Sequence, residues 1–184
     1  MKRSFDSRVD YSLLLPVFCL LVIGVVAIYI AVSHDYPNNV LPILGQQIAW
    51  IALGLVIGFV VMFFNTEFLW KVTPYLYVLG LALMVLPLVF YNPSLVASTG
   101  AKNWVSIGGT TLFQPSEFMK ISYILILARV IVQFTQKHKE WRRTIPLDFL
   151  LIIWMIGFTI PVLVLLALQS DLGTALVFVA IFAG

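Results

Sequence analysis

Long apolar stretches alternate with short polar segments along the whole chain. Each complete stretch holds about twenty residues, the length that a helix needs to cross a bilayer core roughly 30 Å thick. The pattern predicts spans near residues 11–32, 47–64, 75–91, 115–134 and 147–168, and a sixth that runs from 174 to 184. At about 1.5 Å per residue, this last stretch is too short to cross the membrane. We therefore predict an all-α fold, a polytopic membrane helix bundle that forms one integral membrane domain over residues 1–184.

The composition favours a membrane protein over a soluble one. Of the 184 residues, 61% are hydrophobic and 10% are charged, and the mean hydropathy is +1.04. Soluble domains are about 45–50% apolar and about 25% charged. The first apolar stretch is longer than a signal-peptide core and is followed by no small-residue cleavage pattern, so we interpret it as a retained span. Because the sequence stops inside an apolar stretch, we expect the chain to be the first part of a larger protein.

Lysine and arginine are concentrated in alternate segments between the spans. The N-terminus and the segments 65–74 and 135–146 hold Lys2, Arg3, Arg8, Lys71, Lys137, Lys139, Arg142 and Arg143, whereas the other connecting segments hold only Lys102. By the positive-inside rule, the N-terminus is cytoplasmic and the segment 92–114 faces outward. The basic run 136–143 is interpreted as a topology determinant near anionic lipid, so we expect no nucleic-acid partner.

Isolated residues within the spans indicate packing more than chemistry. The single cysteine, Cys19, excludes an intrachain disulfide, and the two histidines fall in different loops, so no metal site is predicted. Gly54 and Gly58 have the spacing that allows close approach of a neighbouring helix. Arg129 is placed to reach cytoplasmic lipid phosphates from the inner end of the fourth span.

The start of the fourth span carries two charged residues, Glu117 and Lys120, which are unusual inside an apolar stretch. Pro115 suits the first position of a helix, and Ser116 and Glu117 then fall in the first turn, where the helix dipole favours a carboxylate. Lys120 lies one turn deeper on the same helix face as Glu117, so the two charges can offset each other. A lysine buried in a bilayer is costly. Two interpretations stay open: a purely structural ion pair, or part of a pocket for an anionic, lipid-linked headgroup.

The loop that precedes this span is long for a connection between helices, which is typical of functional loops. Trp104 is placed to lie at the membrane interface, where tryptophan is enriched. Gly108, followed by a second glycine, allows a tight turn. We expect residues 92–114 to form an outward-facing loop with a role at the membrane surface.

A second polar group occurs between the fifth and sixth spans. Ser170 or Asp171 is placed to cap the sixth helix, and Gly173 allows another helix to approach closely. Capping alone would explain the aspartate. However, Gln169, Asp171 and Thr174 are expected at the same membrane level as the charged pair at the start of the fourth span. We therefore predict that these five polar side chains converge on one shared site.

These two polar segments resemble the signature segments of the SEDS family (shape, elongation, division and sporulation), the RodA/FtsW group of bacterial membrane proteins. The segments are "GAKNWVSIGGTTLFQPSEFMKI" from residue 100 and "QSDLGTALVF" from residue 169. The matching residues are Gly100, Ala101, Trp104, Gly108, Phe113, Gln114, Pro115, Ser116, Glu117, Lys120, Gln169, Asp171, Leu172, Gly173 and Thr174. The resemblance implies the first five to six spans of a ten-helix SEDS fold, most like the RodA branch.

The resemblance implies a peptidoglycan glycosyltransferase of the bacterial cell membrane. Such an enzyme polymerises lipid II, an undecaprenyl-pyrophosphate-linked disaccharide pentapeptide, into glycan strands on the outer face, here for elongation and rod shape. The implied partners are a class B penicillin-binding protein that crosslinks the strands and other membrane proteins of the elongation complex. The family's general-base carboxylate lies downstream of residue 184, so no catalytic residue is assigned and the 184-residue chain alone is expected to be inactive.

The residues present are given supporting roles in this implied site. Lys120 is expected to hold the pyrophosphate or orient a carboxylate, and Glu117 and Asp171 to fix that geometry. The other supporting residues are Gln114, Ser116, Gln169 and Thr174, and the substrate loop contributes Trp104 and Gly108. No organic cofactor is evident, but a divalent cation, Mg²⁺ or Mn²⁺, could accompany the pyrophosphate.

Two other functions are compatible with charged residues in a helical membrane protein. A lipid II flippase would need polar residues through the full membrane depth. A scaffold that positions a crosslinking partner would depend on its glycine and aromatic surfaces, with the charged residues dispensable. Because the polar residues cluster on the outer side, the sequence favours chemistry at the membrane surface.

Overall fold

The computed structural model describes residues 11–108, 110–137 and 147–184. Two compact units, Met1–Asn65 and Thr66–Gly184, make up the chain. Five helices of the described residues are long and apolar enough to cross a membrane. The predicted polytopic helical fold is therefore confirmed, whereas the prediction of a single domain stays a prediction.

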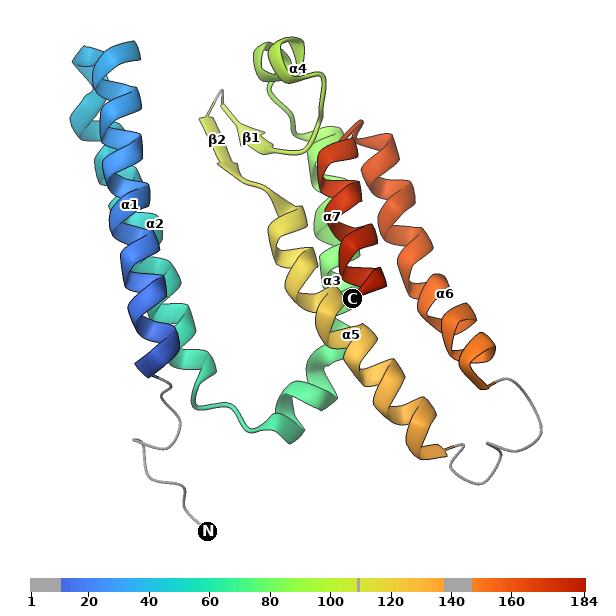
Figure 1. The fold of residues 1–184 in the computed structure, drawn as a ribbon. Coiled ribbons are helices and arrows are strands. Elements are labelled where there is room, and N and C mark those ends of the chain that lie inside the picture. The colour runs from blue at the N-terminus through green and yellow to red at the C-terminus, as the bar shows by residue number, and fades with distance from the viewer. Residues whose placement is uncertain (1–10, 109, 138–146) are drawn as a thin grey trace. The chain divides into compact units, whose positions relative to one another are not determined.

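The first unit is a pair of apolar helices. Helix α1 (Tyr11–Asp35) contacts α2 (Val40–Val61), and a 3-10 turn, η2 (Pro37–Asn39), joins them (Figure 1). None of their described side chains is buried within the chain, so the apolar surface is available to lipid. A methyl group added to Gly54 or Gly58 would meet no atom within 4 Å. The close helix approach predicted at these glycines is therefore absent from the described part of the chain.

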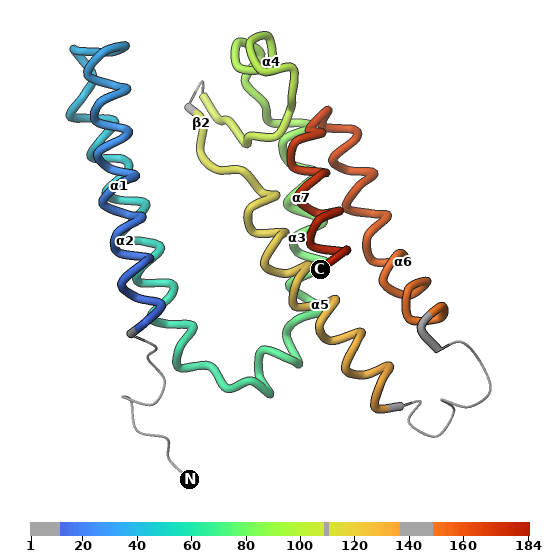
Figure 2. Tube along the Cα trace, in the orientation of Figure 1, coloured from blue at the N-terminus to red at the C-terminus, as the bar shows by residue number. Residues whose placement is uncertain are grey.

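The second unit is built around α5. Its elements are α3 (Thr66–Val89), α4 (Pro93–Thr99), β1 (Val105–Ile107), β2 (Thr110–Phe113), α5 (Pro115–Lys137), α6 (Leu147–Leu168) and α7 (Leu172–Ala183). Helix α5 contacts α3, α6 and α7, and α6 also contacts α3 and α7. Figure 2 shows that α4 and the two strands lie at the end of this unit where α5 and α7 begin.

The observed helix boundaries agree with the spans predicted from the apolar pattern, except where a helix continues into polar residues. Helix α6 has the predicted bounds, and α1 and α5 extend three residues beyond theirs, to Asp35 and Lys137. Helix α2 begins at Val40 rather than near 47, and α7 begins at Leu172 rather than 174. The interpretation of residues 65–74 as a loop was wrong, because α3 begins at Thr66. Glu67 lies in its first turn, where the helix dipole favours a carboxylate.

The segment 92–114 is more ordered than the predicted loop. Asn92 caps α4 by accepting a hydrogen bond from the Ser94 N–H at 3.0 Å, and α4 ends at Gly100 in the left-handed region, with φ of 75°. Strands β1 and β2 then pair antiparallel, with Ile107 opposite Thr110, so that the turn between them starts at Gly108, whose φ is 61°. The tight turn predicted at Gly108 is confirmed. The hairpin is the one exception to the all-α description among the described residues.

The core of the second unit lies along one face of α5. The buried apolar residues are Tyr77, Met84, Met119, Tyr123, Ile126, Leu127, Val162, Leu166 and Phe178. Helix α3 approaches α5 closely at Gly80, where an added Cβ would lie 2.5 Å from the Met119 Sδ and 3.0 Å from the Ser122 Oγ. The glycine that permits close helix packing is thus Gly80, which the sequence pattern did not single out.

Two buried hydroxyl groups connect α6 to its neighbours. The Tyr77 hydroxyl of α3 donates a hydrogen bond to the Phe158 carbonyl at 2.6 Å, and the Tyr123 hydroxyl of α5 lies 2.7 Å from the Thr159 hydroxyl. Both contacts fall within one turn of Pro161, which interrupts the hydrogen-bond ladder of α6. Neighbouring helices therefore supply partners close to the point where the proline disturbs the helix.

Arg129 has a partner within the protein that the sequence analysis did not predict, and its contact with lipid phosphate stays a prediction. Its guanidinium Nη1 donates a hydrogen bond to the Trp70 carbonyl of α3. Pro74 lies four residues after Trp70 and has no N–H, so the Trp70 carbonyl lacks its usual helical donor. Arg129 replaces that donor, and its hydrogen bond links α5 to α3.

We predict a coupling between Arg129 and Pro74 in the stability of the protein. Arg129→Met should lower the free energy of unfolding by about 1–3 kcal/mol, because it leaves the Trp70 carbonyl unpaired. In a Pro74→Ala background the restored N–H can bond to that carbonyl, so the same change should cost less. Thermal unfolding of the four variants in one detergent measures the coupling. An equal cost of Arg129→Met in both backgrounds would contradict this explanation.

Candidate functional site

The hairpin lies at the same end of the second unit as the starts of α5 and α7 (Figure 1). Helix α5 begins there with Pro115 directly after β2, and α7 begins there after a short connection from α6. Three segments that are distant in sequence therefore meet at one end: the hairpin, the first turn of α5 and the α6–α7 connection.

The α6–α7 connection is fixed by two helix caps. The Asp171 N–H donates to the Leu166 carbonyl at 3.0 Å, and the Ser170 N–H donates to the Ala167 carbonyl at 3.1 Å. This is the Schellman arrangement, and it requires the left-handed conformation that Ser170 adopts, with φ of 59°. The Asp171 side chain then caps α7 by accepting a hydrogen bond from the Thr174 N–H at 3.0 Å. Of the two predicted capping residues, Asp171 is the one that caps α7.

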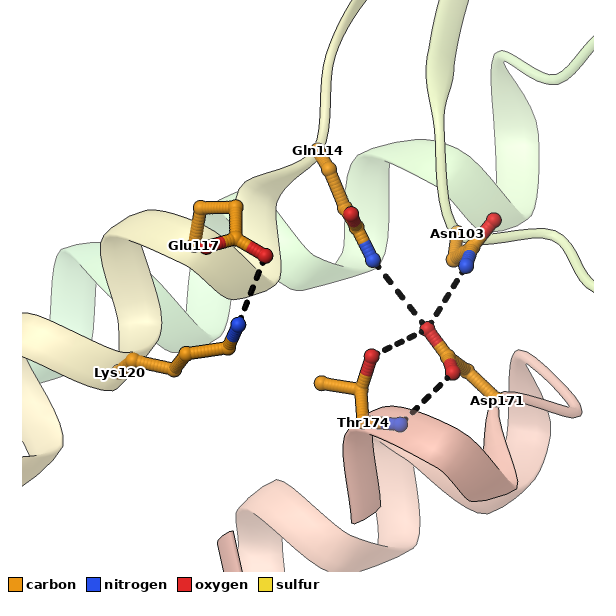
Figure 3. Close-up of polar contacts among 6 residues, drawn as sticks. All are labelled: Asn103, Gln114, Glu117, Lys120, Asp171 and Thr174. Atoms are coloured by element: carbon orange, nitrogen blue, oxygen red, sulfur yellow. Dashed lines mark hydrogen bonds and ion pairs between the residues drawn. The ribbon is translucent and has the colours of Figure 1, made fainter. Parts of the chain in front are cut away.

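The Asp171 carboxylate also holds both ends of the hairpin. Its Oδ2 accepts hydrogen bonds from the Asn103 Nδ2 at 2.8 Å, the Gln114 Nε2 at 3.3 Å and the Thr174 hydroxyl at 2.8 Å (Figure 3). Asn103 precedes β1 and Gln114 directly follows β2. One carboxylate therefore joins the base of the hairpin to the start of α7.

The environment of Asp171 keeps it ionised. Burial raises the pKa of its carboxyl group, but hydrogen bonds from the Thr174 N–H and from the Asn103, Thr174 and Gln114 side chains together lower the pKa below its ordinary value. A carboxylate has about four lone-pair positions, and Asp171 accepts four hydrogen bonds. A group with a lowered pKa and so many donors is suited to holding structure and poorly suited to removing a proton.

Gln169 is buried but does not join the Asp171 cluster. Its side-chain Nε2 donates to the Met84 carbonyl of α3 at 2.5 Å, and its backbone carbonyl accepts a hydrogen bond from the Lys102 N–H at 2.8 Å. Gln169 thus ties the α6–α7 connection to α3 and to the chain just before the hairpin. Among the described residues, neither of these bonds joins Gln169 to the Asp171 carboxylate or to the charged pair, so the convergence of the five polar side chains stays a prediction.

Glu117 and Lys120 form the predicted ion pair on one face of α5. The Lys120 Nζ lies 2.7 Å from the Glu117 Oε1, and the Lys120 and Glu117 side chains are 26% and 62% exposed, respectively. Figure 3 shows this pair beside the Asp171 cluster, with no hydrogen bond drawn between the two groups. The carboxylate of the pair is therefore mostly exposed at the start of the helix, and the lysine side chain is partly exposed.

The remaining predicted residues, Ser116 and Trp104, form no described hydrogen bond to Asp171 or to the charged pair. Ser116 is 2% exposed, and its hydroxyl has no partner among the described residues. Trp104 is partly exposed, as expected for a residue at a membrane interface. Asn103 was missed by the sequence analysis, although an amide between Lys102 and Trp104 in a polar connecting segment was a visible candidate. No group of three or more His, Cys, Asp or Glu residues in the described chain could hold a metal ion.

Apolar helices with a polar cluster at one end define a multi-pass membrane protein of the helical class. A family model for cell cycle proteins, named for FtsW, RodA and SpoVE, matches residues 11–184. The chain belongs to this family, which is the SEDS family that its two polar segments resemble.

Several relatives support the same assignment. The peptidoglycan glycosyltransferase RodA of Treponema pallidum is 28% identical over 96% of this chain and 37% of its own length. The probable peptidoglycan glycosyltransferase FtsW of Burkholderia thailandensis is 30% identical over 95% of this chain and 37% of its own. The peptidoglycan glycosyltransferase MrdB of Escherichia coli is 33% identical over 71% of this chain and 33% of its own. The chain thus spans well under half the length of these relatives.

A solved structure has the same fold. It comes from work on the structural coordination of polymerization and crosslinking by a peptidoglycan synthase complex. The TM-score is 0.63 and the sequence identity is 27%, over 92% of this chain and 44% of that chain. The likeness in fold therefore extends over nearly the whole of the present chain.

We predict that Asp171 contributes a pH-dependent part of the stability. Because its pKa in the folded protein is lowered, the contribution is fully present above the ordinary carboxyl value of 3.8 and is lost as pH falls through the lower folded value. Asp171→Asn should cost about 1–3 kcal/mol at pH 7, since it sets an amide N–H₂ among hydrogen-bond donors. Unfolding of both proteins from pH 7 down to pH 3 measures the difference, which should shrink only at the acid end; a constant difference would count against the assignment.

Proposed function

We propose that this chain is part of a peptidoglycan glycosyltransferase that polymerises lipid II into glycan strands. The names of the relatives support this activity. The observation that carries the proposal is the accessible Glu117–Lys120 pair at the start of α5, next to a hairpin whose base is held by Asp171. This pair offers a cation where a lipid-linked pyrophosphate can approach it.

The chemistry of transfer explains the proposed roles. An acceptor sugar hydroxyl must lose a proton while negative charge develops on the pyrophosphate leaving group. Lys120 exchanges its contact with Glu117 for a pyrophosphate oxygen and stabilises that charge. Asp171 holds Asn103 and Gln114 in place, and the proton is taken by a carboxylate downstream of residue 184. Mg²⁺ or Mn²⁺ is proposed as a counter-ion that arrives with the pyrophosphate, and a rate that falls on adding EDTA would support it.

The proposed topology puts this reaction outside the cell. The positive-inside rule puts the N-terminus in the cytoplasm of a bacterium. The hairpin and the first turns of α5 and α7 then lie at the outer face of the membrane. Labelling of single cysteines at Ser98 and Lys71 from outside intact cells, in a chain with Cys19→Ala, tests this orientation: only the first should react.

The proposed physiological role is cell elongation, as in the RodA branch. The proposed partners are a class B penicillin-binding protein and other membrane proteins of the elongation complex. The solved structure with the same fold belongs to a synthase complex for polymerization and crosslinking, which supports a crosslinking partner. Rescue of rod shape, rather than of division, in cells depleted of their own enzyme distinguishes the elongation from the division branch.

We predict that Lys120→Ala in the full-length protein slows lipid II polymerisation by roughly 10²–10³-fold, the usual cost of removing a group that stabilises developing charge. Glu117→Gln should have a smaller effect, because it removes only the resting partner of Lys120. Lys71→Ala, a change of a lysine on α3 with no described ion pair, is the matched control. The measurement is the rate at which labelled lipid II becomes polymer in liposomes.

The same assay separates the proposal from its rivals. Lipid II that crosses the bilayer without polymer formation would indicate a flippase. If lipid II neither crosses the bilayer nor forms polymer, the protein is a scaffold. Normal polymerisation by Lys120→Ala would remove Lys120 from the proposed site.

A further inference from the structure

Lys102 is the charged residue near the site to which no role has been given. It lies between Ala101 and Asn103, at the point where the chain enters the hairpin. Its backbone N–H is bonded to the Gln169 carbonyl at 2.8 Å, and the next residue, Asn103, is bonded to Asp171. The backbone of Lys102 is therefore fixed from both sides, unlike that of a lysine in an open loop.

The Lys102 ammonium group rests on an aromatic ring. Its Nζ lies 4.6 Å from the centroid of the Tyr91 ring, within the range of a cation–π contact. Such a contact orients the ammonium group without neutralising it, because the ring carries no net charge. Tyr91 follows the end of α3, so the ammonium group is held beside the end of a membrane-spanning helix.

The charge on Lys102 is not compensated by a carboxylate among the described residues. The described ion pairs are His34–Asp35 and Glu117–Lys120, and neither includes Lys102. Asp171, the carboxylate bonded to the neighbouring Asn103, already accepts four hydrogen bonds from other groups. An oriented ammonium group without a counter-charge favours an external anion.

The position of Lys102 identifies the kind of anion. The segment between α3 and α5 joins two membrane-spanning helices, so it lies at the membrane boundary, and the partly exposed Trp104 beside Lys102 is typical of the headgroup level. The anions concentrated at that level are phosphate groups carried by lipids. A lysine acts on phosphate as a point charge and needs no second partner for this contact.

We propose that Lys102, oriented by Tyr91, binds a phosphate group carried by a lipid. Two sources share this chemistry: the headgroups of anionic phospholipids, and the pyrophosphate of a lipid-linked substrate. The second source rests on the proposed function, whereas the first does not. In either case Lys102 is a second cationic contact, separate from Lys120.

The test uses the full-length protein that contains this chain, reconstituted in nanodiscs. The first measurement is the affinity for a short-chain prenyl pyrophosphate in phosphatidylcholine nanodiscs. The second is the retention of phosphatidylglycerol from mixed phosphatidylcholine and phosphatidylglycerol membranes, counted by native mass spectrometry. The variants are Lys102→Met, Lys102→Arg, Tyr91→Phe and Tyr91→Leu, with Lys71→Met as the control for loss of one lysine.

Lys102→Met should weaken at least one of the two interactions about tenfold, the usual effect of removing one charge-assisted hydrogen bond. Lys102→Arg should stay within about twofold of the unchanged protein, since it keeps the charge and the ring contact. Tyr91→Phe should have no effect, whereas Tyr91→Leu should weaken the same interaction by about two- to fivefold, because it removes the aromatic face. Lys71→Met should leave the affinity for the prenyl pyrophosphate unchanged, because Lys71 lies near the opposite end of α3 from Tyr91.

The pattern of losses identifies the source of the phosphate. Loss of prenyl pyrophosphate alone indicates the substrate, loss of phosphatidylglycerol alone indicates the membrane surface, and loss of both indicates shared use. A protein that forms no polymer but retains phosphatidylglycerol through Lys102 would refute the proposed function and leave this inference standing.

The inference is overturned if Lys102→Met binds both lipids as Lys71→Met does. The backbone bond from residue 102 to Gln169 does not depend on the side chain, so Lys102→Met is expected to fold. If it does not fold, the comparison of Tyr91→Leu with Tyr91→Phe decides the question, and equal binding by those two variants overturns the inference in the same way.

Discussion

A backbone carbonyl in a membrane needs a hydrogen-bond donor, and the second unit depends on how that need is met near its prolines. The Trp70 carbonyl lies four residues before Pro74 and so loses its helical donor, whereas the Met84 and Phe158 carbonyls lie three residues before Pro87 and Pro161. Each accepts a hydrogen bond from a side chain of another segment: Arg129, Gln169 and Tyr77, respectively. These bonds join α3 to α5, to the α6–α7 connection and to α6. Pro74 thus explains why the Trp70 carbonyl needs the Arg129 donor, and the other two bonds add a side-chain donor to a carbonyl close to a proline.

The polar site extends the same principle to the membrane boundary. The Asp171 carboxylate accepts a hydrogen bond from the Thr174 N–H, which would otherwise be free at the start of α7. The same carboxylate also fixes Asn103 and Gln114 at the base of the hairpin. The groups left accessible are therefore the Glu117–Lys120 pair and the ammonium group of Lys102, and the surrounding hydrogen bonds hold their backbones in place. The structure thus distinguishes the side chains that hold the hairpin and the α6–α7 connection in place from the charged side chains beside them.

Much of this architecture could be predicted from the sequence, and the misses have physical causes. The length of the apolar stretch was enough to predict the bounds of α6, because the polarity of the sequence changes at Pro146 and at Gln169. It failed for residues 65–74, where polar side chains interrupt the apolar run but the helical backbone continues. The hairpin was missed because strands of three and four residues carry too little alternation to detect.

The sequence predicted which residues belong to the candidate site better than it predicted which of them contact each other. Glu117 and Lys120 pair as expected, since spacing along one helix fixes which side chains are neighbours. Contacts between distant segments are not fixed in this way: the Gln169 side chain donates to the Met84 carbonyl, and Asn103 became visible only through its bond to Asp171. Sequence gives depth along the membrane normal, whereas direction around each helix axis depends on packing. The functional roles of these residues stay predictions.

The close contact at Gly80 has a consequence for how natural variation in this protein should be interpreted. Any side chain at position 80 must displace Met119, and Met119 is covalently next to Lys120. A bulkier residue there would therefore disturb the packing of α3 against the segment of α5 that holds Met119 and Ser122, close in sequence to Lys120. In a genetic screen, such an allele would map to the interior of the bundle, at the contact between α3 and α5.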